Sequence, residues 1–69
     1  MQSRSFHLYE VQDEIEAQEV MQELSNIEGV RSVQGDYETR IFAVTWSEPA
    51  TWEDIRVALA NLHYTPDYP

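Results

Sequence analysis

The sequence predicts an α+β domain in which two helices cover one face of a four-stranded antiparallel sheet. Two stretches have the apolar spacing of amphipathic helices and carry helix start signals. A third stretch, from Arg40 to Trp46, is rich in the β-branched and aromatic residues typical of strands. The predicted elements follow the order β-α-β, β-α-β. Two such right-handed units side by side give the ferredoxin-like arrangement, with an expected strand order of 4-1-3-2.

The first helix is predicted from Asp13 to about Asn26. Its apolar residues recur at spacings of three, four and three, so they share one face: Ala17, Val20, Leu24 and Ile27. The residues between them are polar and can face water: Glu14, Glu19, Gln22 and Glu23. Asp13 and Glu16 have the spacing of a capping box, two residues after the apolar Val11. Gly29 suits the left-handed conformation that ends many helices.

Three strands are predicted around this helix. The first places Phe6 and Leu8 inward, and the second is a weaker strand from Val30 to Gly35, where the glycine indicates a bulge or the strand's end. The third strand alternates between two faces. Its bulkier set should face the core: Phe42, Val44 and Trp46.

The second helix is predicted to start at Thr51, where Asp54 completes a capping box and Ala50 and Ile55 have the spacing of a hydrophobic staple. Its inner stripe is Ile55, Ala58, Leu59 and Leu62. The tail from Tyr64 to Pro69 can form only a brief edge strand, because its prolines cannot donate to a ladder. One core cluster is expected between the sheet and the helices: Leu8, Val20, Leu24, Val44, Ile55 and Leu59.

The 69 residues are expected to form a single domain, 1–69, with a net charge of −9. This charge repels phosphate, so it argues against nucleic acid and against anionic membrane surfaces as partners. A basic partner protein or a cation complements it. The chain contains no cysteine, which excludes thiolate chemistry and is consistent with a reducing compartment.

The residue patterns also argue against catalysis and against insertion into a membrane. No apolar run approaches the length of a membrane span and the first residues lack a signal-peptide core, so a cytoplasmic location is expected. No set of Ser, His and Asp has catalytic spacing, and there is no glycine-rich phosphate loop. We therefore expect a protein that is not an enzyme and uses no cofactor.

The sequence resembles the heavy-metal-associated domain family, which includes small copper chaperones and the repeats of copper-pumping ATPases. The first helix and its Gly-Val exit are similar to those of the family, as is Val44-Thr-Trp46 followed by a proline. The second helix and the aromatic residue after it are similar as well: Thr51, Ile55, Leu59, Leu62 and Tyr64. The resemblance covers nearly the whole chain and implies a ferredoxin-like fold.

The chain departs from the family at the metal loop. The family binds soft metal through a Met-x-Cys-x-x-Cys loop before the first helix. In this register Val11 takes the methionine position, while Asp13 and Glu16 take the two cysteine positions. His63 replaces the glycine that precedes the C-terminal aromatic residue. Copper(I) prefers sulfur ligands, so the family's metal transfer cannot be carried over to these residues.

Asp13 and Glu16 have two interpretations. They could hold a harder cation together with His63 and Tyr64. Alternatively, Asp13 accepts hydrogen bonds from the start of the helix and Glu16 reaches back, which needs no ligand and accounts for both residue types at this spacing. The second interpretation predicts that the metal site has been lost.

The sheet face away from the helices is a candidate interface. It should carry Tyr9 and Ile41, which make it partly apolar, together with His7, Ser32, Ala43 and Thr45. The sequence thus predicts a non-enzymatic interaction or regulatory module, with a basic partner protein or self-association through the open sheet face. The alternative is a weak metal-binding or carrier domain that uses Asp13, Glu16 and His63.

Overall fold

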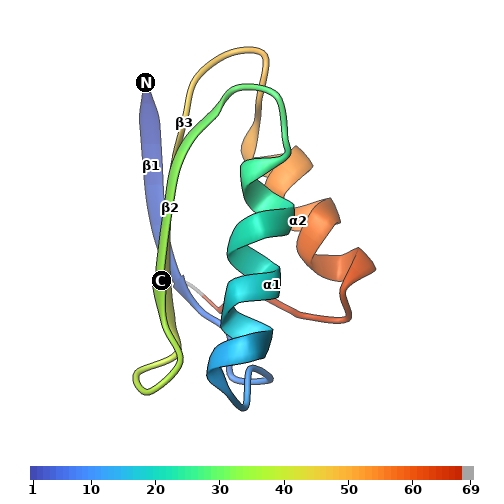
Figure 1. Ribbon diagram of the computed structural model, residues 1–69. Coiled ribbons are helices and arrows are strands. Elements are labelled where there is room, and N and C mark those ends of the chain that lie inside the picture. The colour runs from blue at the N-terminus through green and yellow to red at the C-terminus, as the bar shows by residue number, and fades with distance from the viewer. Residues whose placement is uncertain (68–69) are drawn as a thin grey trace.

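The computed structural model describes residues 1–67 and places two helices on the same side of one antiparallel sheet (Figure 1). In chain order the elements are β1 (Gln2–His7), α1 (Glu14–Ser25), β2 (Val30–Asp36), β3 (Ile41–Trp46) and α2 (Trp52–Asn61). Within the sheet, β3 lies between β1 and β2 and pairs antiparallel with both. The predicted α+β class and both predicted helices are confirmed.

The predicted fourth strand is wrong for the part of the chain that is described, where the sheet has three strands. The tail forms a single antiparallel bridge, in which the N–H groups of His7 and Asp67 each donate to the other's carbonyl oxygen at 2.8 and 2.9 Å. The bridge lies on the outer edge of β1, where a fourth strand would lie. The next N–H of the tail that would point toward β1 is that of Thr65, and it donates instead to Glu10 Oε2 at 3.2 Å, so the pairing does not extend toward Tyr64. The last two predicted strand residues lie outside the described range.

The core lies between the sheet and the two helices, as predicted. All six residues expected in the core cluster have no exposed surface, and the inward set of β3 is buried as well. Phe6 lies opposite Phe42 in the β1–β3 register, and their rings stack with centroids 6.3 Å apart. Near the edge of β1, the guanidinium of Arg4 lies 4.6 Å from the ring centroid of Trp52. The aliphatic and aromatic side chains therefore fill the core without help from disulfides.

Gly35 is explained by an aromatic ring rather than by a bulge. The β2 register shifts between Val30 and Ser32, so the bulge lies near Arg31 and not at Gly35. Gly35 is paired with Phe42, and a Cβ at this position would lie 2.2 Å from the Phe42 ring. Any side chain here would displace that ring from the core.

The second glycine also permits a close approach. Gly29 has a φ of +101°, but α1 ends earlier with Asn26 as its C-cap, so Gly29 does not cap the helix as predicted. A Cβ on Gly29 would lie 2.4 Å from the carbonyl oxygen of Ser47 and 2.7 Å from the nitrogen of Ala50. The glycine thus lets the turn after α1 contact the loop before α2.

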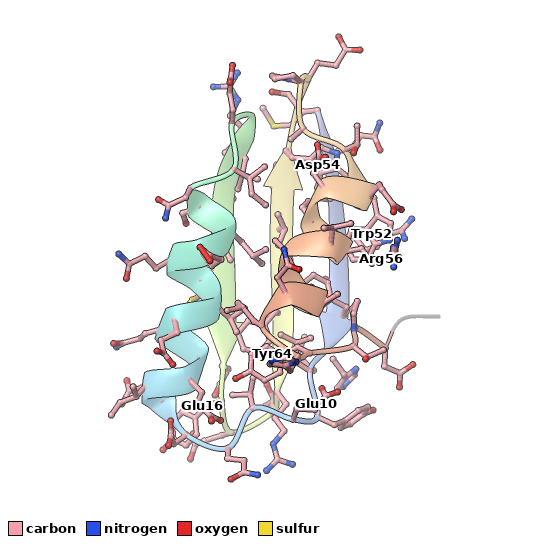
Figure 2. All side chains as sticks on the ribbon, turned by 90° about the vertical axis from the view of Figure 1, so that its right-hand side faces the viewer. Glu10, Glu16, Trp52, Asp54, Arg56 and Tyr64 are labelled. Atoms are coloured by element: carbon pink, nitrogen blue, oxygen red, sulfur yellow. The ribbon has the colours of Figure 1, made fainter. Side chains whose placement is uncertain are left out.

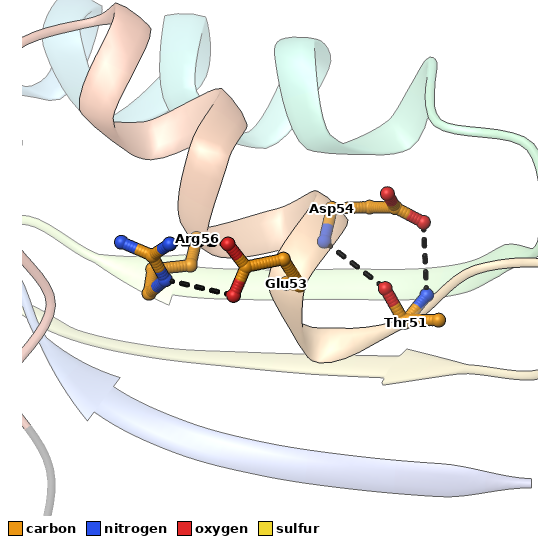
Figure 3. Close-up of polar contacts among 4 residues, drawn as sticks. All are labelled: Thr51, Glu53, Asp54 and Arg56. Carbon is orange, nitrogen blue, oxygen red and sulfur yellow. Dashed lines mark hydrogen bonds and ion pairs between the residues drawn. The ribbon is translucent and has the colours of Figure 1, made fainter.

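The predicted capping box of α2 is confirmed (Figure 3). The Asp54 N–H donates to Thr51 Oγ1 at 3.2 Å, and the Thr51 N–H donates to Asp54 Oδ2 at 3.1 Å. In the first turns of α2, Arg56 forms an ion pair with Glu53, and the hydrogen bond from Arg56 lowers the pKa of the Glu53 carboxyl. The start of α2 is therefore fixed by its own side chains.

Candidate functional site

The candidate site is the loop before α1 together with the first turn of that helix. Asp13 is the N-cap, and its Oδ1 accepts the Glu16 N–H at 2.8 Å, as predicted. Glu16 reaches back as well, but its Oε1 accepts the N–H of Gln12 at 2.7 Å and not that of Asp13. The two carboxylates therefore bind backbone donors in a displaced form of the capping box.

Arg40, in the β2–β3 hairpin, contacts this loop through two hydrogen bonds that the sequence did not reveal. Its Nε donates to the carbonyl oxygen of Val11 at 2.8 Å, and its own carbonyl accepts the Leu8 N–H at 2.9 Å. Val11, which the resemblance places at the family's methionine position, is fully buried. Residues 11 and 40 are too far apart in sequence for a local pattern to have shown this contact.

His63 has a backbone role at the end of α2. Its φ is +69°, its N–H donates to the carbonyl of Ala60 at 2.9 Å, and the next N–H, that of Tyr64, donates to Leu59 at 2.9 Å. These two bonds form a Schellman motif, which usually has glycine where His63 lies. The departure from the family's glycine therefore leaves the helix end intact, and the His63 residue is exposed.

Tyr64 lies among the carboxylates at this end of the molecule, between Glu16 of α1 and Glu10 of the loop (Figure 2). Partial burial raises the pKa of its phenol, and the nearby negative charges raise it further: Glu16, Glu19, Asp13 and Glu10. Glu10 also ties the tail to the loop, because its Oε2 accepts the Thr65 N–H at 3.2 Å. Carboxylates of the loop and of α1 therefore act together on the Tyr64 phenol in the tail.

The structure does not gather the candidate ligands into a metal site. Within residues 1–67, no three His, Asp or Glu side chains are placed so that they could hold a metal ion, so Asp13, Glu16 and His63 do not form such a group. Asp13 and Glu16 already accept backbone hydrogen bonds. Without thiols, the loop also lacks the donors that a soft metal prefers.

The open sheet face has the predicted composition. His7 pairs with Ile41 in the register, and Ser32 pairs with Thr45, so these residues share the face away from the helices. Ile41 is 43% exposed; Tyr9, which follows β1, is 57% exposed and stacks on His7 with ring centroids 5.1 Å apart. Whether a partner uses Tyr9 and Ile41 stays a prediction.

The fold is shared with several solved structures, among them a metallochaperone and a copper transporter domain. The structure matches that of the CsoZ metallochaperone with a TM-score of 0.88 and 16% identity, over 97% of each chain. It matches oxidized MerP from Ralstonia metallidurans CH34 with a TM-score of 0.86 and 22% identity, over 96% of this chain and 93% of that one. The yeast copper transporter domain Ccc2a gives a TM-score of 0.86 and 12% identity, over 97% and 93%. The resemblance to heavy-metal-associated domains is thereby confirmed at the level of the fold.

No family model matches the sequence, and no curated protein is significantly similar to it. Neither helix of the described chain has the length and apolar character needed to cross a lipid bilayer.

Proposed function

We propose that this chain is a non-enzymatic protein-interaction module with a metallochaperone fold, and that it binds a basic partner protein through the acidic end formed by the loop and α1. The observation that carries the proposal is that Asp13 and Glu16 serve as capping residues at the start of α1. At the positions where the resemblance places metal ligands, both carboxylates accept hydrogen bonds from backbone N–H groups. A cation would have to compete with the cap of α1.

The charge distribution supports a basic partner. The chain has 13 acids and four bases, and exposed carboxylates follow the loop and the outer face of α1: Glu10, Asp13, Glu14, Glu19 and Glu23. Oppositely charged surfaces accelerate association and select against like-charged partners. Ile15, which is 71% exposed in the first turns of α1, offers an apolar contact within this acidic surface.

A titration with a lysine-rich peptide tests the proposal by NMR. We expect the largest shift changes between residues 10 and 19 and at Tyr64, and we expect the double variant Glu14→Gln, Glu19→Gln to weaken binding. The matched control is Glu28→Gln, Glu48→Gln, which removes the same charge from exposed loops at the other end of the sheet. Equal weakening by the two double variants would contradict a defined docking surface.

The alternative, a weak cation-binding domain, is tested by calorimetry with Zn²⁺, Ni²⁺, Cu²⁺ and Ca²⁺ beside an Asp13→Ala, Glu16→Ala variant. We expect copper(I) binding at background and divalent binding no tighter than about millimolar, which corresponds to about 4 kcal/mol. Micromolar affinity for Zn²⁺ or Ni²⁺, lost in Glu16→Gln combined with His63→Ala, would overturn the proposal that the metal site has been lost.

A further inference from the structure

We propose that Arg40 is a clasp that fixes the shape of the loop before α1. Two hydrogen bonds connect this residue to the two ends of the turn from Leu8 to Val11. The Arg40 carbonyl accepts the Leu8 N–H at 2.9 Å, and its Nε donates to the Val11 carbonyl at 2.8 Å. The turn is closed on itself by the Val11 N–H, which donates to Leu8 at 3.2 Å. One residue therefore holds both ends of the turn.

The clasp is anchored in the sheet. The Arg40 N–H donates to the carbonyl of Asp36 at 2.7 Å, which ties the residue into the β2–β3 hairpin immediately before Ile41 begins β3. The contact with Val11 spans 29 positions in the sequence. Because the hairpin belongs to the sheet and the loop does not, their connection limits how far the loop can move.

Arg40 carries a long side chain at a backbone position that favours glycine. Its φ is +62°, in the region that favours glycine over residues with a Cβ. Glycine would suit this backbone better, but it has no side chain to reach Val11. The charged donor makes a stronger hydrogen bond than a neutral one, which offsets the backbone cost.

Loss of the guanidinium should destabilise the loop before α1. Val11 has no exposed surface, so its carbonyl oxygen belongs to a residue anchored in the core and needs a donor. The next two residues begin the cap of α1: the Gln12 N–H donates to Glu16 Oε1, and Asp13 Oδ1 accepts the Glu16 N–H. Without the clasp, opening of the turn would also weaken these capping bonds.

Amide hydrogen exchange in the intact chain tests the clasp. Arg40→Gly relieves the backbone but removes the side chain, and Arg40→Met keeps a side chain of similar length without a donor. In both variants we expect the amides of Val11 and Gln12 to exchange about tenfold faster or more, after correction for global stability measured at the buried Val44. The control is Arg31→Gln, which loses a 3.0 Å bond from Nε to Ser47 Oγ at the other end of β3 and should leave both amides unchanged.

Wild-type protection at Val11 and Gln12 in either Arg40 variant would overturn the proposal, because the donor would then be unnecessary. A uniform change across all amides, with no excess in the loop, would overturn it too. The measurement involves no partner and no metal, so its result is independent of the peptide and metal titrations.

Discussion

His63 shows how a single residue can preserve a local structure at a cost. The helix end needs a positive φ at this position, and the two hydrogen bonds of the Schellman motif form although the residue is not glycine. A side chain with a Cβ is strained in this conformation, by about 1–2 kcal/mol for most residues. A glycine also raises the conformational entropy of the unfolded chain, and this cancels part of the stability gained by relieving the strain.

We therefore predict that His63→Gly stabilises the domain by about 0.5–1 kcal/mol in urea unfolding. His63→Ala is the control, because it removes the imidazole but keeps the Cβ, and it should show no such gain. If the glycine variant were less stable than the wild type, the imidazole itself would be contributing to the fold.

Tyr64 gives a second prediction at this scale. Burial is the largest single cause of its raised pKa and Glu16 is the first of the four charged causes, so Glu16→Gln should lower the pKa but leave it above the ordinary value of 10.0. NMR titration of the Tyr64 ring measures this directly. A return to the ordinary value would mean that the carboxylates, and not burial, dominate.

The same shift has a consequence for stability at alkaline pH. The folded chain keeps the phenol protonated to higher pH than the unfolded chain does, so it binds more protons between the two pKa values. The contribution of Tyr64 to stability is full below pH 10 and is lost as pH rises through the folded pKa. Tyr64→Phe should therefore reduce the loss of stability above pH 10.

Among the elements, the two helices begin in the same way and differ in one bond. Thr51 and Asp54 bond reciprocally, whereas Glu16 bonds to the N–H of Gln12, one residue before the cap. In both helices the side chain of the N-cap residue accepts the N–H three residues later. This bond is the part of the pattern that both caps share.

We predict that Asp13→Ala costs about 0.5–2 kcal/mol of unfolding free energy and that Asp13→Ser restores most of it. Serine can accept the same N–H but cannot hold a cation as a carboxylate does. A chain equally stable with alanine would show that the aspartate serves something other than the cap.

Patterns within one element were readable from the sequence, and contacts between distant elements were not. The helix stripes, the N-caps and the alternation of β3 depend on neighbouring residues and were predicted, whereas the predicted cap at Gly29 was wrong. The length of a fourth strand depends on how far the tail around Asp67 can pair with β1, and within the described residues the tail forms one bridge. The Arg40 contact with Val11 and the ring of Phe42 over Gly35 depend on register across the sheet, which no local spacing encodes.

At the scale of the whole molecule, one apolar core holds the sheet and both helices together. Leu24 from α1 and Leu59 from α2 have no exposed surface and lie in the same cluster as Val44 of β3. Small domains have little stability to spare, so the loss of either side chain is a large fraction of the total.

Leu24→Ala or Leu59→Ala should each cost about 2–5 kcal/mol in denaturant unfolding. The exposed Val57→Ala, on the outer side of α2, is a control that should change stability much less. A small cost at both leucines would mean that the core repacks around the lost volume.

The open edge of β1 makes the net charge important for preventing aggregation. Within the described residues this edge is paired only at His7, which leaves the outward main-chain groups of Ser3 and Ser5 as a template for strands of other copies. At a net charge of −9, long-range repulsion keeps two copies apart before such edges meet. Near the isoelectric point, about 4.3, that barrier disappears, so acid precipitation should begin by edge-to-edge growth of the sheet.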